Sequence, residues 1–294
     1  MPYAVAETRQ DSRYMMLDEF EDPNGILPVT VDEQRKGGVK NYERRTIYAG
    51  QFLFKLVPIT VDMYHRMREE GILPSREHIE LLNGVMFWVD RRGPEGYGKP
   101  SETVALTPKQ YDRMLEVGIL QERAPIELIE GFMVWKDRSA EGEDFMTIGD
   151  KHRTCTALLQ RLTLLVERVG ATLFMQVPML LPDNSEPEPD GYIARGTIRR
   201  YLKRKPDRND VTCVIEVSQS SLVVDRGRKL RNYAKAGIPQ YLVINVNGEF
   251  VDVFENPVSS GQYTKETRLR KHQSVLLRIG AKATIKVRVK SLLP

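Results

Sequence analysis

Two nearly continuous apolar runs constrain the fold of this chain most strongly. Residues 211–218 (VTCVIEVS) and 240–246 (QYLVINV) have the composition of strands that are buried on both faces of a sheet. Between them, residues 221–237 (SLVVDRGRKLRNYAKAG) predict a helix that ends at Gly237. A strand, a helix and a second strand form a βαβ crossover. The fold class is therefore predicted as α/β (α+β), with a mixed β-sheet that is flanked by helices.

The neighbouring segments predict further elements of the same sheet. Asp150 is a candidate N-cap for a helix over 151–169, whose leucines and valines recur at helical spacing. Residues 171–181 and 190–194 are interpreted as strands. Residues 247–256 are expected to pair with 240–246 through an Asn-Gly turn.

The first half of the chain contains an internal repeat. Residues 57–91 align with 104–138 at a constant offset of 47, and 18 of the 35 positions are identical. Two copies are too few for a solenoid, so a partial duplication of one helix–strand unit is the better interpretation. The expected N-caps are Thr60 and Thr107, the expected helix stops are Gly71 and Gly118, and the strands are expected to pass through Gly84 and Gly131.

The repeat divides the chain into four expected parts. Residues 1–56 are interpreted as a polar arm that is partly disordered. A truncated duplicate of the helix–strand unit follows at 57–91, and a Gly/Pro-rich linker at 92–103. Only the second copy leads into the main domain, which is predicted to span 104–294.

Composition excludes several classes of protein. The 294 residues include two cysteines, which excludes a disulfide scaffold and a multi-cysteine zinc site. No run of about 18 apolar residues is present, so no membrane span is predicted. The N-terminal residues lack the apolar core of a secretory signal, and the expected location is the cytoplasm.

The net charge of +4 is unevenly distributed. Residues 195–235 and 262–294 each carry a net charge of +8, whereas residues 1–194 carry −9. This asymmetry is compatible with a polyanionic partner such as nucleic acid. A solvated basic surface without a partner explains the charge equally well, so both interpretations stay open at this point.

Three residues suggest chemistry when they are taken together. Asp190 begins a short predicted strand, and Glu216 lies within an apolar one, where an unpaired charge is costly. Two carboxylates on neighbouring strands can share a Mg²⁺ ion. Lys229 could stabilise negative charge in a transition state beside them. Taken singly, a turn cap, a solvent-reaching Glu216 and a surface Asp225–Lys229 ion pair are simpler explanations.

The order of these motifs resembles a known family. The segments PEPDGYIA (187–194), VIEVSQSS (214–221) and DRGRKLRNYAKAGIPQYLVINV (225–246) resemble the Uma-two family of restriction endonucleases, in the PD-(D/E)XK nuclease-like superfamily. ELIEG (127–131) and MTIGDKH (146–152) are similar to earlier segments of that family. The resemblance covers about residues 104–294, and it implies a restriction-endonuclease-like fold.

The resemblance also implies roles for individual residues. It makes Asp190, Glu216 and the main-chain carbonyl of Val217 the ligands of a Mg²⁺ (or Mn²⁺) ion. The chain departs from the superfamily pattern at Ser218, where lysine is expected, and Lys229 is the candidate replacement.

Five further residues complete the predicted site. Asp225 and Tyr233 lie one turn on either side of Lys229 and are candidates to orient it. Glu127 and His152 match family positions near the metal, and Gln176 matches a polar position on the preceding strand. A first-turn helix residue at His152 and a buried, hydrogen-bonded Gln176 are the simpler alternatives.

These expectations lead to two main hypotheses. The first is a metal-dependent endonuclease that hydrolyses phosphodiester bonds in duplex DNA and acts as a homodimer when it cuts both strands. Its expected phosphate contacts are Arg199, Arg200, Lys203, Arg204 and Lys205. The second is a catalytically inactive nuclease-like module that binds DNA or a protein, and the distance from Lys229 to the carboxylates discriminates between the two. A small-molecule phosphohydrolase would instead need a closed pocket.

Overall fold

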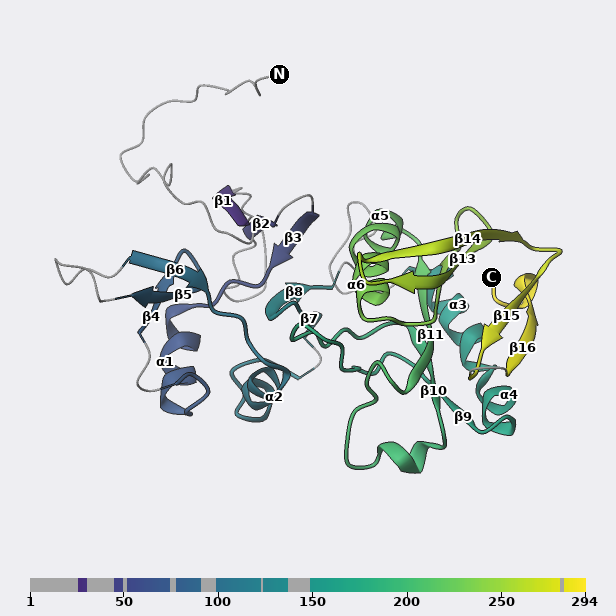
Figure 1. Ribbon diagram of the computed structural model, residues 1–294, viewed down its shortest axis with the longest axis horizontal. Helices are drawn as coiled ribbons and strands as arrows, with labels where there is room; N and C mark the ends of the chain where they lie inside the picture. The colour runs from purple at the N-terminus through teal and green to yellow at the C-terminus, as the bar shows by residue number, and fades with distance from the viewer. Residues whose placement is uncertain are drawn as a thin grey trace, which may run out of the picture.

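The computed structural model describes residues 26–30, 45–49, 52–74, 78–90, 99–122, 124–136, 149–280 and 283–294 (Figure 1). Its helices are α1 (Val61–Glu69), α2 (Pro108–Glu116), α3 (Asp150–Gln160), α4 (Thr163–Arg168), α5 (Leu222–Val224) and α6 (Leu230–Lys235). The strands of the first half are β1 (Ile26–Thr30), β2 (Arg45–Ala49), β3 (Phe52–Leu56), β4 (Ile79–Leu82), β5 (Val85–Asp90), β6 (Lys99–Thr103), β7 (Ile126–Ile129) and β8 (Phe132–Trp135). The strands of the second half are β9 (Ala171–Phe174), β10 (Gly191–Arg195), β11 (Val211–Ser218), β12 (Gln240–Asn245), β13 (Phe250–Val258), β14 (Gln262–Arg270), β15 (Ser274–Arg278) and β16 (Thr284–Arg288).

A six-stranded mixed sheet forms the centre of the second half. Its strand order is β14-β13-β12-β11-β10-β9, and β11 and β12 are parallel while the other neighbours are antiparallel. The predicted βαβ crossover and the pairing of 240–246 with the following strand are therefore confirmed. The fold class is the predicted one, a mixed sheet flanked by helices.

Both faces of this sheet are covered, which explains the continuous apolar runs. On one face Cys213, Ile215 and Val217 pack with residues of α3, α4 and the β15–β16 hairpin. On the other face Val214 and Tyr241 pack with residues of α6. Because side chains alternate along a strand, Glu216 projects toward the α6 face.

Three predicted elements differ from the structure. The helix predicted over 151–169 is divided into α3 and α4 where the Thr163 hydroxyl donates to the Gln160 carbonyl, a bond that competes with the helical ladder. The strand predicted over 171–181 ends at Phe174, because Gln176 has a positive φ of 51° and Pro178 follows. The predicted helix over 221–237 contains a π-helical segment, Asp225–Lys229, between α5 and α6.

The N-cap predicted at Asp150 is also wrong. Gly149 occupies the cap position, and the Gln219 side chain accepts the hydrogen bond from the His152 N–H at 3.0 Å. A Cβ atom on Gly149 would lie 2.5 Å from the Gln219 amide, so a larger residue there would displace this side chain from the start of α3. The loop after β11 thus holds the start of α3.

Each repeat copy folds into a helix followed by a hairpin. The predicted N-caps Thr60 and Thr107 are confirmed, since each hydroxyl accepts a main-chain N–H. The single strand predicted through Gly84 and Gly131 is wrong: each glycine lies in the turn of a hairpin. The turn residues in both copies have positive φ, as the tight turns that join antiparallel strands require. Lys99–Thr103, within the predicted linker, forms β6.

Gly131→Ala is expected to lower the free energy of unfolding by about 2–4 kcal/mol. The added methyl would meet Ala105 Cβ at 2.5 Å, on a backbone whose φ is +80°. Gly71→Ala is the control, because its φ is +64° but nothing lies within 4 Å of the new atom. Urea unfolding curves should show the larger loss for Gly131→Ala; equal losses would mean that the contact with Ala105 is relieved at no cost.

The second repeat copy is joined to the large sheet's half of the chain. The Glu186 N–H donates to the Leu128 carbonyl at 2.6 Å, and the Gly131 N–H donates to the Asn184 carbonyl at 3.0 Å. Figure 1 shows the two helix–hairpin units beside the half that carries the six-stranded sheet. These bonds place β7, which carries Glu127, next to that half. Within the described residues, no helix is both long and apolar enough to span a membrane.

Candidate active site

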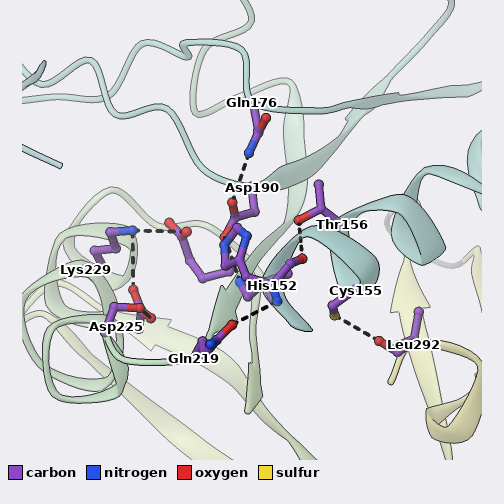
Figure 2. A network of polar contacts seen from close by, with 12 residues as sticks. His152, Cys155, Thr156, Gln176, Asp190, Gln219, Asp225, Lys229 and Leu292 are labelled. Carbon is purple, nitrogen blue, oxygen red and sulfur yellow. Dashed lines mark hydrogen bonds and ion pairs between the residues drawn. The ribbon is translucent and has the colours of Figure 1, made fainter. Parts of the chain in front are cut away.

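A polar pocket of about 90 Å³ lies where β10 begins and β11 ends. Figure 2 shows the polar network around it. The residues that line the pocket are Glu127, Lys136, Gly149, His152, Gln176, Glu188, Asp190, Glu216, Val217, Gln219, Ser220, Ser221 and Lys229. Asp190, Glu216, Lys229, Glu127, His152, Val217 and Gln176 were all predicted site residues, and the structure brings them together.

Asp190 lies at the centre of this network (Figure 2). One of its oxygens, Oδ2, accepts the Val217 N–H at 2.8 Å and lies 3.2 Å from His152 Nε2. The other oxygen accepts from Gln176 Nε2 at 3.4 Å. Burial alone would raise the pKa of Asp190, but His152, Lys229 and the Val217 N–H together lower it. Asp190 is therefore an ionised carboxylate.

Glu216 is almost completely buried beneath α6. Its Oε1 accepts the Tyr233 hydroxyl at 2.9 Å, and its Oε2 lies 3.0 Å from Lys229 Nζ. Burial raises the pKa of Glu216 to about 8, although Lys229 acts in the opposite direction. Burial therefore makes the ionised form of this carboxylate costly, and the nearby ammonium offsets part of that cost.

Lys229 is held from two sides. Its ammonium lies 3.0 Å from Glu216 and 3.3 Å from Asp225 Oδ1, and Asp225 in turn accepts the Ser221 hydroxyl at 2.5 Å. Burial alone would lower the pKa of Lys229, but Glu216 and Asp225 raise it well above its ordinary value. Lys229 is therefore cationic.

The main chain around Lys229 is unusual. Lys229 ends the π-helical segment Asp225–Lys229, and the Tyr241 hydroxyl donates to the Asp225 carbonyl at 2.9 Å. Single π-helical turns inside helices are frequent at functional sites. The Lys229 ammonium reaches Glu216 from this turn, in the crossover that follows β11.

Glu127 reaches the pocket from the second repeat copy. It is buried, its Oε2 accepts the Glu188 N–H at 3.3 Å, and its Oε1 lies 3.9 Å from Arg228 Nη2. Lys136, which follows β8 in the same copy, forms an ion pair with Glu188. Glu80, which is the counterpart of Glu127 in the first copy, is exposed.

The donor set fits a hard divalent cation. Four carboxyl groups and two lysines line the pocket, so acidic side chains outnumber lysines there. Among the described residues, no three His, Cys, Asp or Glu side chains are grouped closely enough to hold a metal. Mg²⁺ needs only one or two carboxylates, because it retains several of its waters. Asp190 and Glu216 both line the pocket and meet this requirement.

None of the predicted phosphate-binding residues lines the pocket. Their loop follows Arg195, five residues beyond Asp190 along β10, which is about 16 Å at the rise of a strand. Arg200 and Arg204 pair with the buried Asp210, and Lys205 pairs with Asp112 and Glu186. Exposed side chains in this loop include Arg199 and Lys203.

A comparison with known protein families identifies the family of this chain. The Uma2 family model, described as "Putative restriction endonuclease", matches residues 141–287, which is half of the chain. The chain belongs to the Uma2 family. Its Uma2 segment contains Asp190, Glu216 and Lys229, and the description of the family indicates a nuclease. The resemblance found in the sequence motifs is confirmed.

Comparisons with solved structures and with curated proteins add no further functional information. Solved chains that match include "a putative nuclease belonging to DUF820 from Anabaena variabilis ATCC 29413", which is 15% identical, with a TM-score of 0.41. That match covers 60% of this chain and 94% of the other. No curated protein matches the chain.

Six pocket residues were not predicted from the sequence: Lys136, Gly149, Glu188, Gln219, Ser220 and Ser221. Gln219 and Ser221 follow directly on the predicted strand that carries Glu216, and Glu188 stands two residues before Asp190. Their closeness to predicted ligands was a usable signal. Lys136 gave no such signal, because it lies outside the Uma2 match and enters the pocket only through the fold of the second repeat copy.

Proposed function

We propose that this protein is a metal-dependent endonuclease that hydrolyses phosphodiester bonds in duplex DNA. The observation that carries the proposal is the convergence of Asp190, Glu216 and Lys229 in one polar pocket. Asp190, Glu216 and the main-chain carbonyl of Val217 would hold Mg²⁺ or Mn²⁺. When bound, the ion supplies an activated water and neutralises charge on the phosphate.

The chain's own residues have separable roles in this proposal. Lys229 remains protonated beside Glu216, so it stabilises negative charge on the reacting phosphate and does not act as a base. Asp225 and Tyr233 are positioning residues: Asp225 holds the lysine, and Tyr233 fixes one oxygen of Glu216. Gln176 and His152 hold the orientation of the Asp190 carboxylate.

The position of Lys229 favours catalysis over an inactive binding module. Its ammonium lies 3.0 Å from Glu216, so the third charged group that the catalytic hypothesis needs is within reach of the carboxylates. Cutting both strands of a duplex with one such pocket per chain would require two copies of the chain.

Plasmid cleavage tests the proposal directly. Supercoiled DNA is incubated with the wild type and with Glu216→Gln, in Mg²⁺ or Mn²⁺ and with excess EDTA. Nicked or linear DNA is expected from the wild type alone, and only when metal is present. If wild type and variant behave alike with both metals, the nuclease proposal fails and the inactive binding module becomes the better interpretation.

Glu127→Gln is expected to slow cleavage about 10–100-fold, the range typical of substitutions just outside the ligands of a metal, because Glu127 lines the pocket. Glu80→Gln is the matched control, because Glu80 has the same position in the first repeat copy but is exposed. Its cleavage rate should equal that of the wild type. Equal rates for both variants would remove Glu127 from the site.

Lys203→Ala is expected to weaken DNA binding without changing sequence preference, and to reduce the slope of log affinity against log salt by about one. Its side chain is exposed in the basic loop. Fluorescence anisotropy of a labelled duplex across a salt series measures the slope. An unchanged slope would show that this loop does not contact phosphates.

A further inference from the structure

The two repeat copies have the same internal structure. In the first copy the Tyr64 hydroxyl donates to the Ile79 carbonyl at 2.6 Å, and in the second the Tyr111 hydroxyl donates to the Ile126 carbonyl at 3.1 Å. These residues differ in number by the repeat offset of 47. The copies are therefore equivalent units, and they can be compared contact by contact.

The main-chain contacts between the copies are reciprocal. The Val57 N–H donates to the Met133 carbonyl at 2.9 Å, and the Val104 N–H donates to the Met86 carbonyl at 2.8 Å. The donors Val57 and Val104 have equivalent positions in the two copies, and so do the acceptors Met133 and Met86, because each pair differs in number by 47. Each copy's leading strand thus pairs with the hairpin of the other copy.

The strand registers follow the same rule. Leu56 of β3 lies opposite Val134 of β8, and Thr103 of β6 lies opposite Phe87 of β5. These two pairs are also interchanged by the offset of 47. The exchange therefore extends through both pairs of strands.

Side chains at the helix ends repeat the exchange. Arg66 donates to the Val117 carbonyl at 2.9 Å, at the end of α2, while Arg113 forms an ion pair with Glu70, at the end of α1, at 3.0 Å. Buried residues of both copies share one apolar core, which includes Met67 and Met114. An interface is called isologous when residue i of one unit contacts residue j of the other and residue j of the first contacts residue i of the second. Two-fold dimers have interfaces of this kind.

We infer that residues 104–136 carry a self-recognition surface whose partner is a second copy of the same unit, and that the first repeat copy occupies this surface within the chain. The chain is therefore kept from dimerising through this face. Association through the face returns when the first copy is displaced, because residues 104–136 can then pair with the same residues of another chain. This inference does not depend on nuclease activity.

The test uses the full chain and a cysteine pair. In the proposed dimer, Thr103 of one chain would lie opposite Val134 of the other, since Thr103 takes the place of Leu56. Antiparallel partners are close enough for a disulfide. In the native pairing these two positions face other residues, so Thr103→Cys/Val134→Cys should not cross-link. The native cysteines are fully buried.

Adding Met67→Asp to this cysteine pair should displace the first copy, because Met67 is fully buried in the shared core. After oxidation, most of the chain is expected to shift from monomer to a covalent dimer on non-reducing gels. The inference is overturned if the Met67→Asp protein does not cross-link, or if the cysteine pair cross-links chains without Met67→Asp.

Leu56→Cys/Val134→Cys keeps the test decisive if Met67→Asp fails to fold. These two residues face each other in the native pairing, so an intrachain disulfide is expected, with a faster-migrating monomer on non-reducing gels. Leu56→Cys alone is the control. A disulfide between chains at this pair would mean that the first copy does not occupy the face within its own chain.

Discussion

Lys229→Met is expected to lower the free energy of unfolding of the metal-free protein by about 3–5 kcal/mol, the cost of removing one partner from a buried ion pair. Glu216 and Asp225, both almost completely buried, would lose the cation that lies 3.0 and 3.3 Å from them. The loss should grow as the pH rises, because protonation of the two carboxyls relieves their repulsion at low pH.

Urea unfolding in EDTA, at pH 6 and pH 9, measures this effect. Lys235→Met is the control: it lies on the same helix, pairs with Glu130 at 3.4 Å near the surface and should cost less than about 1 kcal/mol. Adding Glu216→Gln to Lys229→Met should restore much of the lost stability. If Lys229→Met costs no more than Lys235→Met, the ammonium does not compensate these carboxylates.

The central strands of the large sheet could be predicted from the sequence, because strands that are buried on both faces consist almost entirely of apolar residues. Residues 211–218 and 240–246 are apolar throughout because both faces of their sheet are covered, and no other element type fits their length and flanks. Asp190, Glu216 and Lys229 were expected to meet because the order of their motifs resembles that of the Uma-two family. Their strands are neighbours, and the crossover helix returns over the same face.

What the sequence could not predict depends on contacts between distant residues. Apolar periodicity does not distinguish an α-helix from one with a π-helical turn, so the segment around Lys229 read as a regular helix. Because apolar residues lie on both sides of Gly131, the sequence pattern predicted one continuous strand there and not the hairpin that is observed. Gln219 holds the start of α3 at His152, 67 residues earlier in the chain, a pairing that no local pattern reveals.

Asp190→Asn is expected to slow metal-dependent DNA cleavage about 1,000-fold or more, since the charge stabilisation supplied by a bound metal amounts to several kcal/mol. The substitution keeps the size of the side chain and an oxygen that can accept the Val217 N–H, so the fold should be retained. It removes the negative charge that a cation needs.

A second readout separates metal binding from catalysis. The melting temperature of the wild type should rise with increasing Mn²⁺, because a ligand that binds only the folded state stabilises it. Asp190→Asn should lose most of that rise, whereas Asp150→Asn, whose carboxylate is exposed at the start of α3, should keep it. If Asp190→Asn keeps the rise but loses cleavage, Asp190 acts on the reaction without holding the metal. If it keeps both, the proposed site is wrong, because Asp190 is the carboxylate around which His152, Gln176 and the Val217 N–H are arranged.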